Sequence, residues 1–332
     1  MRTKYLCLGI ESTAHTFGAS VVSSDGRILS NVKHTYTTKS MGIVPSKLAE
    51  HHLSHWYDVI TKALKQANTS IKDIKLISYS RSPGIGHALR IGAFIARTIA
   101  KKYGKALVGV NHCIAHLEIG NLTTQATDPV LLYCSGVNTQ VIAYTSHRYR
   151  IFGETLDIGI GNLLDSVARD MGLGFPGGPK IEQLAKLSNR YIELPYSVKG
   201  MDVSFGGLLT NIRQKLRSGK YKNEDIAFSL QETSFAMLIE VAERAMAHLN
   251  KSQLLLGGGV ACNKRLQEMA KIMCKQRNAR CFIPPDQYLV DNAAMIAHLG
   301  ILMHNAGHNL EPIEADIDPY ERVDDVIVDW KH

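Results

Sequence analysis

The chain has 332 residues, long enough for two domains of ordinary size and a large buried core. Its hydrophobic content of 45% and charged content of 20% are typical of a globular protein, and the absence of any run of eighteen apolar residues argues against a membrane protein. The net charge of +8 favours a polyanionic partner, and six scattered cysteines without a Cys-x-x-Cys pair predict reduced thiols in a cytoplasmic protein.

The N-terminal third predicts three strands followed by alternating helices and strands. Strands at Tyr5–Ile10, Gly18–Ser23 and Arg27–Thr35 surround a polar loop at Glu11–His15. Further strands are expected at 74–80 and 106–111, and helices at 46–66, 88–103 and from His112 onward.

The same order of strand, polar loop, strand, tight turn and strand recurs roughly 125 residues later. Its strands are expected at 130–134, 139–144 and 149–156, and later strands at 253–256 and 280–284. Helices are expected at 162–172, 181–187, 226–250, 261–275 and 292–306. The repeat predicts an α/β fold of two duplicated domains, 1–125 and 126–294, with the ligand in the cleft between them and the segment from about 295 to 332 packed back on the first.

His112 and His116 predict a metal site. Residues four apart on a helix project from one face, so two imidazoles can hold one ion, with Asp291 as a carboxylate ligand. The zinc-protease signature needs a glutamate directly after the first histidine, where this chain has Cys113, so peptide hydrolysis is not expected. The alternative for an isolated pair is two polar residues on a helix face.

Three glycines, Gly257, Gly258 and Gly259, join a predicted strand to a predicted helix. Glycines at that place allow backbone N–H groups to approach an anion or a purine at the positive end of the helix. Asn263, expected one turn into the helix, is a natural partner for an adenine or ribose edge. The alternative is a tight strand-to-helix turn without a ligand.

Other polar residues are candidates for the same cleft. Asp165 and Glu182 stand near glycines and could accept hydrogen bonds from ribose hydroxyls, although Asp165 could equally cap a helix. The loops Glu11–His15 and Ser135–Gln140 occupy matching places in the repeat and are expected to face the cleft. Tyr133, next to the second loop, would point its phenol there, although a tyrosine in such a strand is more often part of a core.

Several ordered motifs together resemble the TsaD family, the catalytic subunits of tRNA threonylcarbamoyladenosine synthesis. They are His112-x-x-x-His116, Ser135-Gly-Val-Asn-Thr-Gln140, Gly153-Glu-Thr-Leu-Asp157, Gly161-Asn-x-x-Asp165, Lys199-Gly-Met-Asp-Val-Ser-Phe205, Gly257-Gly-Gly-Val-Ala-Cys-Asn263 and Asp291-Asn-Ala-Ala-Met-Ile296. Thr13-Ala-His-Thr-Phe17 resembles the archaeal and eukaryotic branch, whose members work within the KEOPS complex.

The resemblance implies an actin-like, Hsp70-like fold and an acyltransferase. Such an enzyme moves the threonylcarbamoyl group from threonylcarbamoyl-AMP to N6 of the adenosine beside the anticodon in tRNAs that read ANN codons, and releases AMP. It also implies one Fe(II) ion, with Zn(II) as the alternative, held by His112, His116 and Asp291, with Tyr133 as a fourth ligand. The residues implied around the acyl-adenylate are Tyr133, Cys134, Ser135, Gly136, Val137, Asp165, Gly178, Glu182 and Asn263.

The implied partners are tRNA, a synthase that supplies threonylcarbamoyl-AMP, and other KEOPS subunits. One of those subunits is a small protein kinase, expected as a separate chain because no kinase-sized segment follows Trp330. The alternative function is an ATP-binding or ATP-hydrolysing scaffold subunit of the complex. A basic stretch could touch phosphates or be a solvated loop, and consists of Lys215, Arg217, Lys220 and Lys222.

The chain departs from the family pattern at a few positions. Val137 stands where a second glycine is usual, and Ser46-Lys47 replaces an Arg-Glu pair. Phe175-Pro-Gly-Gly178 varies a Ser-Pro-Gly loop, and Leu289-Val290 replaces Cys-Thr before Asp291. His51, His52 and His55 also have helical spacing, and we expect them to be surface or core histidines and not metal ligands.

Overall fold

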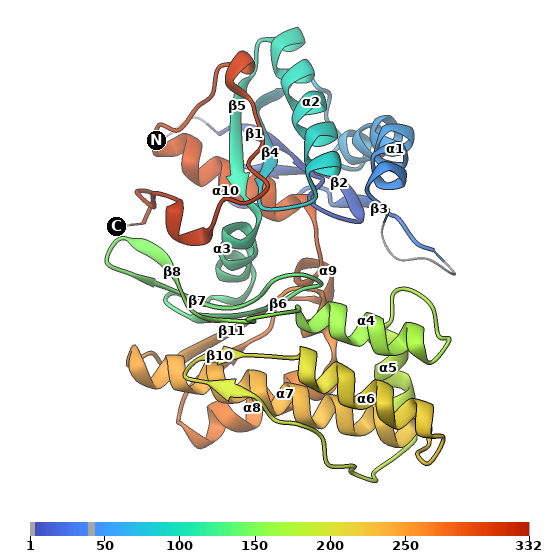
Figure 1. The fold of residues 1–332 in the computed structure, drawn as a ribbon. Coiled ribbons are helices and arrows are strands. Elements are labelled where there is room, and N and C mark those ends of the chain that lie inside the picture. The colour runs from blue at the N-terminus through green and yellow to red at the C-terminus, as the bar shows by residue number, and fades with distance from the viewer. Residues whose placement is uncertain (1–3, 39–43, 332) are drawn as a thin grey trace.

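The computed structural model describes residues 4–38 and 44–331, and it has two lobes that each contain one mixed sheet (Figure 1). The first sheet has the strand order β3-β2-β1-β4-β5. Its strands are β1 (Leu6–Glu11), β2 (Thr16–Ser23), β3 (Val32–Thr35), β4 (Ile74–Ser82) and β5 (Ala106–Asn111). The hairpin strands β1, β2 and β3 pair antiparallel, whereas β4 and β5 continue the sheet parallel to β1.

The second sheet repeats this topology strand for strand, in the order β12-β11-β6-β7-β8. Its strands are β6 (Val130–Cys134), β7 (Thr139–Thr145), β8 (Arg148–Glu154), β11 (Gln253–Gly257) and β12 (Arg280–Phe282). Again the first three strands are antiparallel and the last two join in parallel. The duplication that the sequence predicts is therefore confirmed by the pairing of both sheets.

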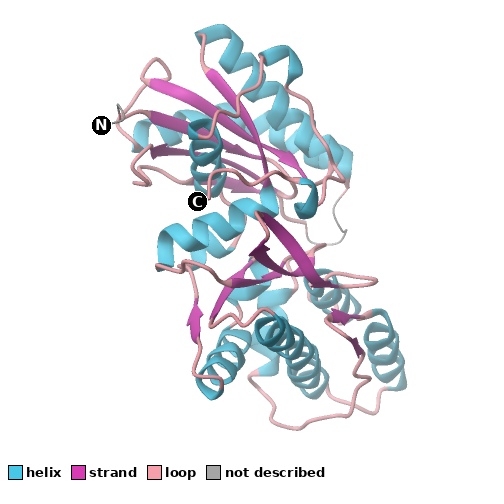
Figure 2. Ribbon diagram, turned by 90° about the vertical axis from the view of Figure 1, so that its left-hand side faces the viewer, coloured by secondary structure: helices cyan, strands magenta, loops and turns pink. Residues whose placement is uncertain are grey.

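Helices cover both faces of the first sheet because side chains on β1 alternate between two cores. Leu8 and Ile10 pack in the core beneath α1 (Pro45–Gln66) and α2 (Gly86–Tyr103). Cys7 points to the other core, beneath α3 (His112–Thr124) and α10 (Ala293–Asn305). The C-terminal helix α10 thus returns to the first sheet, as the views in Figures 1 and 2 also show.

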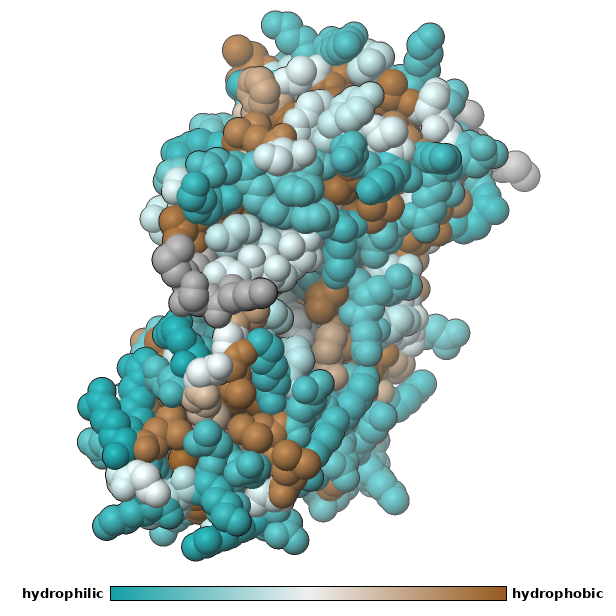
Figure 3. Space-filling view, turned by 90° about the vertical axis from the view of Figure 1, so that its right-hand side faces the viewer, coloured by the Kyte–Doolittle hydropathy of each residue, from teal (hydrophilic) through white to brown (hydrophobic). Residues whose placement is uncertain are grey.

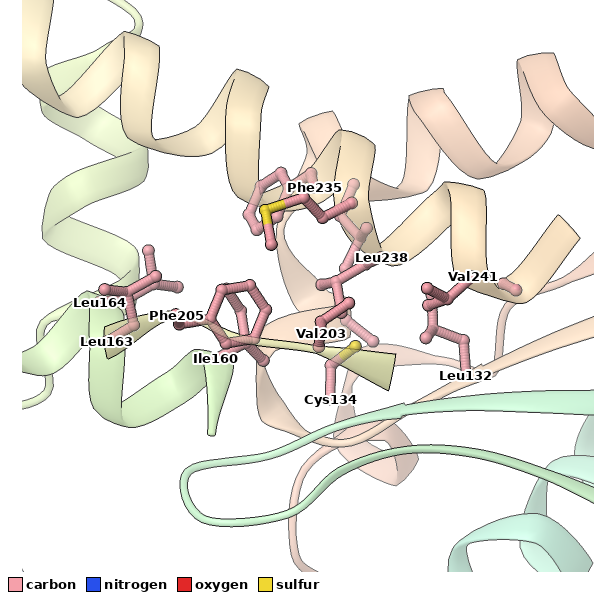
Figure 4. Close-up of a cluster of buried hydrophobic side chains, with 14 of the residues drawn as sticks. Leu132, Cys134, Ile160, Leu163, Leu164, Val203, Phe205, Phe235, Leu238 and Val241 are labelled. Carbon is pink, nitrogen blue, oxygen red and sulfur yellow. The ribbon is translucent and has the colours of Figure 1, made fainter. Parts of the chain in front are cut away.

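The second lobe has its own apolar core between the sheet and a layer of helices (Figure 4). Leu132 and Cys134 of β6 contribute to it, opposite Leu238 and Val241 of the longest helix, α7. The helices of this lobe are α4 (Ile160–Asp170), α5 (Gly178–Ala185), α6 (Gly206–Ser218), α7 (Asn223–His248) and α8 (Lys264–Gln276). The boundaries of the two domains along the chain stay a prediction.

The structure differs from the predicted elements mainly in the second lobe. Helix α6, the short helix α9 (Asp286–Leu289) and the small hairpin of β9 (Val198–Lys199) and β10 (Asp202–Val203) were not predicted. The glycines at the start of α6 conceal it in the sequence, and Lys215 and Arg217 belong to its last turn. Strand β3 is also shorter than expected, beginning at Val32 instead of residue 27.

The core that contains Cys7 also joins the two lobes around α3 and α10. It combines Val108 of the first sheet with Leu131 and Leu255 of the second, and with Ile114 and Met295 of the two helices. On the side shown in Figure 3 the surface is hollowed between the lobes, and its exposed side chains are mostly hydrophilic. Within the described ranges, no helix is long and apolar enough to cross a membrane.

Candidate metal and nucleotide site

Helix α3 begins at the candidate metal ligand His112. The side chain of Asn111 caps the helix by accepting hydrogen bonds from the backbone N–H groups of Cys113 and Ile114, at 3.0 and 3.3 Å. The helix therefore starts where β5 ends, and it presents His112 and His116 on one face, with ring centroids 4.8 Å apart. Both imidazoles are buried.

Asp291 lies between α9 and α10 and brings its carboxylate to both imidazoles. Its Oδ1 is 3.4 Å from Nε2 of His112 and 3.6 Å from Nε2 of His116. The three ligand atoms lie within 4.8 Å of one another. Two histidines of one helix and a carboxylate that is distant in the sequence thus form the group that the sequence predicts.

This group is suited to a metal ion. Ligand atoms that share a tetrahedral ion stand about 3.3 Å apart, close to the observed separations, whereas a hydrogen bond would bring them to about 2.9 Å. Neither ring nitrogen of His116 has a hydrogen-bond partner among the described residues, although both are buried. A buried imidazole without a partner is costly unless another ligand satisfies it. Two imidazoles with one carboxylate are a donor set that suits Fe(II) or Zn(II).

Glu11, the first residue of the loop that was expected to face the cleft, also belongs to this site. It ends β1, is fully buried, and places Oε2 at 3.1 Å from Nδ1 of His112. Its other oxygen accepts a hydrogen bond from the backbone N–H of Thr13, at 2.6 Å. A carboxylate on the far nitrogen of a histidine fixes the tautomer that leaves Nε2 free for a ligand. The signals in the sequence are an acid at the end of an apolar strand and its place at the start of that loop.

The carboxylates dominate the electrostatics of the site. Burial lowers the pKa of His112, but Glu11 and Asp291 outweigh it and raise that pKa to about 10. Burial lowers the pKa of His116. Burial opposes ionisation of Asp291, yet its two histidine partners hold its pKa well below the usual range. A single protonated histidine cannot balance two buried carboxylates, whereas a divalent cation with neutral imidazoles can.

Tyr133 lies against the histidines from the second lobe. It is buried, and its ring centroid is 4.9 Å from that of His116 and 6.5 Å from that of His112. Burial raises the pKa of its hydroxyl well above the usual value. Tyr133 pairs in register with Gly257 of β11, which brings the glycine loop beside the histidines.

The loop after Tyr133 is held against the start of α4. The carbonyls of Ser135 and Gly136 accept hydrogen bonds from the N–H groups of Gly161 and Asn162, at 3.0 and 2.9 Å. The Ser135 hydroxyl is engaged within the loop, where it bonds the carbonyl of Asn138 at 3.0 Å. These N–H groups of α4 are therefore committed to the loop, and they position it instead of binding an anion.

The structure places the side chains of two residues that the resemblance implies around the acyl-adenylate. The side chain of Cys134 is buried in the core of the second lobe (Figure 4), so only its backbone can face a ligand. Val137, the departure from the family pattern, exposes 66% of its surface. It therefore adds an apolar side chain to the solvent side of the loop.

The glycine loop needs glycine at its centre. Gly258 has a φ of +87°, and a Cβ there would be 2.3 Å from the carbonyl oxygen of Cys134. The loop thus lies directly on the end of β6. The residues after it form a 3-10 turn, Gly259–Cys262, and α8 begins only at Lys264.

Asn263 was predicted to lie inside a helix. In the structure it is instead the N-terminal cap of α8. Its Oδ1 accepts hydrogen bonds from the N–H groups of Arg265 and Leu266, at 2.9 and 3.3 Å, and its amide donates to Gln231 at 2.6 Å. The prediction failed because the glycine-rich turn postpones the helix. One amide hydrogen stays available for a ligand.

The acidic candidates lie near the same turn. Oε1 of Glu182, on α5, accepts a hydrogen bond from the N–H of Lys264 at 3.2 Å, which places it beside Asn263. Oδ1 of Asp165, on α4, accepts from the N–H of Gly177 at 2.7 Å, next to Gly178. Burial raises the pKa of Asp165. These residues thus lie within α4, within α5 and at the start of α8.

Several parts of the site lie at the carboxyl ends of strands. Glu11 and Asn111 end strands of the first sheet, and Cys134 and Gly257 end strands of the second. In open α/β sheets ligands bind at these ends. His15 of the first lobe meets Phe175 of the second, with ring centroids 5.8 Å apart, which shows that the two sets of loops adjoin.

Solved structures with similar folds support the two-lobed architecture. HypF of Thermococcus kodakarensis aligns with 91% of this chain and 48% of its own, with a TM-score of 0.63 and 14% identity. Component A of (R)-2-hydroxyglutaryl-CoA dehydratase of Acidaminococcus fermentans aligns with 90% and 97%, with a TM-score of 0.55 and 13% identity. At these identities the likeness concerns the fold alone, which is the duplicated actin-like fold.

Sequence comparisons are more specific. A relative from Thermococcus sibiricus named tRNA N6-adenosine threonylcarbamoyltransferase is 52% identical over 98% of this chain and 100% of its own, and one of the same name from Bos taurus is 47% identical over 98% of both. A bifunctional threonylcarbamoyladenosine biosynthesis protein of Methanocaldococcus jannaschii is 48% identical, over 60% of its length. The model of the TsaD family, described as tRNA N6-adenosine threonylcarbamoyltransferase, matches residues 27–298. The chain therefore belongs to the TsaD family.

Proposed function

We propose that this protein transfers the threonylcarbamoyl group from threonylcarbamoyl-AMP to N6 of the adenosine beside the anticodon in tRNAs that read ANN codons. Membership of the TsaD family supports the reaction class. The observation that carries the proposal is the meeting of His112, His116 and Asp291 with the loops of the second lobe at the facing ends of the two sheets. The three side chains suit a metal ion, and the loops of the second lobe suit a nucleotide.

His112, His116 and Asp291 would hold the ion, with Tyr133 beside them. Fe(II) is our first choice and Zn(II) the alternative, because the donor set of two imidazoles and one carboxylate is common to both. A bound ion would supply Lewis acidity toward an oxygen of the acyl group. Glu11 would keep His112 in the tautomer that leaves Nε2 toward that position.

The reaction needs no nucleophile from the protein. The N6 amine forms a bond to the carbamoyl carbon, the bond from that carbon to the phosphate oxygen of AMP breaks, and the amine loses a proton that the released phosphate can accept. The nearest thiols support this scheme, since burial raises the pKa of Cys113 to about 12 and that of Cys134 further. Neither forms a thiolate readily, so the contribution of the site is mainly to position two substrates.

The adenosine half of threonylcarbamoyl-AMP would lie against the second lobe. Asp165 and Glu182 have carboxylate oxygens for ribose hydroxyls, and the free amide hydrogen of Asn263 suits the adenine edge. Gly258 approaches β6 closely and has no side chain. The surface of the loop is therefore formed by backbone, whose N–H groups can reach a phosphate. The loop from Ser135 to Val137 would lie along the acyl group.

The net charge of +8 supports tRNA as the acceptor. We further propose that a separate synthase supplies threonylcarbamoyl-AMP. The other KEOPS subunits, including the small kinase, would act as separate chains beside this one in the cytoplasm.

The test is transfer of radiolabelled threonine to tRNA, with synthase, ATP, bicarbonate and the partner subunits supplied. The native chain should label tRNA, and His112→Ala/His116→Ala should abolish both metal retention and label. His87→Ala/His147→Ala, at two exposed positions, is the matched control and should keep both.

Transfer at the native rate by the metal-free double variant would overturn the metal's role. No label at all, with active and bound partners, would overturn the transferase proposal and favour an ATP-dependent scaffold.

A further inference from the structure

A second group of histidines lies away from the site described above, between β3 and α1. His34 of β3 meets His51 and His55 of α1, and one ring nitrogen from each lies within 4.8 Å of the others. The rings of His34 and His55 stack with centroids 3.8 Å apart, and the ring of His51 is 4.8 and 4.6 Å from them. We call these three residues the histidine cluster.

The hydrogen bonds around the cluster determine which nitrogens carry lone pairs. Nε2 of His52 is 3.1 Å from the carbonyl oxygen of Ala14, so this nitrogen donates and Nδ1 of His52 accepts. Nδ1 of His51 is 3.0 Å from Nδ1 of His52 and must therefore donate. A lone pair consequently remains on Nε2 of His51, which faces Nδ1 of His34 at 2.7 Å.

His55 is oriented in the same way. Its Nδ1 lies 2.7 Å from the carbonyl oxygen of His51 and donates to it, so Nε2 of His55 also keeps a lone pair. Histidine ligands of metals are generally fixed by such a bond from the other ring nitrogen to a carbonyl or carboxylate. Two of the three imidazoles are thus already in the tautomer of a ligand.

The imidazoles of His51 and His34 also favour the neutral form, which a metal ligand must have. Burial and then the neighbouring His55 and His34 lower the pKa of His51 to about 4. Burial, His55 and Lys62 lower the pKa of His34. Metal binding therefore has no proton to displace from these two rings.

We propose that the histidine cluster binds one divalent transition-metal ion, such as Zn²⁺ or Co²⁺, independently of the His112 group. His34 is exposed and can swing outward, which is needed because Nδ1 of His34 and Nε2 of His51 must separate from 2.7 Å to about 3.3 Å around an ion. Nδ1 of His34 now faces the lone pair on Nε2 of His51 and therefore carries the proton of this ring. For Nδ1 to bind the ion, that proton would move to Nε2 of His34. A water molecule would fill the remaining coordination position of the ion, because His34 lies at the surface.

Such an ion would connect the cluster to the loop that supports His112. His52 contacts His51 and donates a hydrogen bond to the carbonyl of Ala14, in the loop that follows β1. Thr13 of that loop places its hydroxyl 3.2 Å from Nδ1 of His112. Occupancy would fix β3 against α1 and restrain this loop. This role differs from catalysis, and the ion would not touch the substrates.

The test titrates the metal-stripped, full-length protein with Co²⁺, followed by its visible absorption, and measures bound metal after desalting. The native chain should bind two equivalents. His34→Gln/His55→Gln should bind one, and His112→Gln/His116→Gln should also bind one. His87→Gln/His147→Gln, which changes two exposed histidines elsewhere, should bind two.

Adding His34→Gln/His55→Gln to the His112→Gln/His116→Gln chain should remove the last equivalent. Circular dichroism checks that each variant is folded, and the single His34→Gln variant, altered at the exposed ligand, should already weaken the site. Co²⁺ binding that is unchanged by His34→Gln and by the double variant would overturn the proposal. So would a folded His112→Gln/His116→Gln chain that binds no metal.

Discussion

At the scale of single residues, the pair of Glu11 and His112 shows how a buried charge can serve a site. Glu11 is fully buried and bonds the imidazole at 3.1 Å, and the two carboxylates raise the pKa of His112 to about 10. In the metal-free chain His112 is therefore protonated at neutral pH, and it must lose that proton before Nε2 can bind an ion. Metal affinity should consequently rise with pH.

The first prediction concerns Glu11→Gln. Loss of the carboxylate should weaken metal binding by about 10–100-fold at neutral pH, because the tautomer and the basicity of His112 are no longer supported. For the native chain, release of one proton should make the affinity rise about tenfold per pH unit below the folded pKa. The variant should show a shallower slope, since the pKa of its His112 is lower.

The measurement is the metal dissociation constant from pH 6 to 9, by competition with a coloured chelator. Glu50→Gln, at an exposed position of α1, is the control and should behave like the native chain. Equal slopes for Glu11→Gln and the native chain would contradict the role assigned to Glu11.

At the scale of elements, the contact of β1 with α10 depends on a missing side chain. Gly9 faces α10, and a Cβ there would be 2.4 Å from the backbone oxygen of Ala293 and 2.6 Å from the backbone nitrogen of Ala297. Neither backbone atom can move without shifting the helix. Because Asp291 lies just before α10, the position of this helix also sets the position of the carboxylate.

The second prediction is that Gly9→Ala lowers the free energy of unfolding by about 1–3 kcal/mol, the usual effect of overpacking a core. Gly207→Ala is the matched control, since a Cβ at Gly207 meets nothing within 4 Å and an alanine in α6 should be neutral or stabilising by up to about 1 kcal/mol. Guanidinium unfolding measures both. A Gly9→Ala chain as stable as the native one would show that α10 is not in tight contact with the sheet.

At the scale of the whole molecule, Glu118 joins three distant parts of the chain. It lies on α3 and is buried, and its Oε1 accepts hydrogen bonds from the hydroxyl of Tyr149 on β8, at 2.5 Å, and from the indole of Trp330, at 3.0 Å. The first lobe, the second sheet and the C-terminal segment thus share one carboxylate. Both donors would lose their partner if it were removed.

The third prediction is that Glu118→Ala destabilises the protein by about 1–3 kcal/mol, because the buried hydroxyl of Tyr149 is left without a partner and the partly buried indole of Trp330 also loses its acceptor. Tyr149→Phe removes only one of the two donors and should cost less. In a Trp56→Phe background the fluorescence of Trp330 reports the C-terminal segment directly. Its spectrum should shift to longer wavelength in Glu118→Ala as the indole meets water, and an unchanged spectrum would contradict the link.

What could be predicted from the sequence follows the range of the interactions concerned. Helical hydrogen bonds and strand alternation involve neighbours along the chain, so β5 and β6 have the predicted bounds and the pairing of His112 with His116 is confirmed. The strand–loop–strand pattern repeated along the chain, so the duplicated fold was also predictable. Predictions from local patterns were wrong where glycines begin an element. Helix α6 was not predicted, and a 3-10 turn places Asn263 at a helix cap instead of inside the helix.

Only the tertiary structure decided which distant residues meet. Glu11 reaches His112 because β1 and β5 belong to one sheet and end on the same side. His34 completes the histidine cluster because β3 lies beside α1, whereas the spacing of the helix histidines alone predicted surface or core residues and no metal ligands. Sequence spacing by itself determined the duplicated fold and the pair on α3, since those depend on near neighbours. The complete sites depend on strand order and helix packing, which bring together side chains that are not neighbours along the chain.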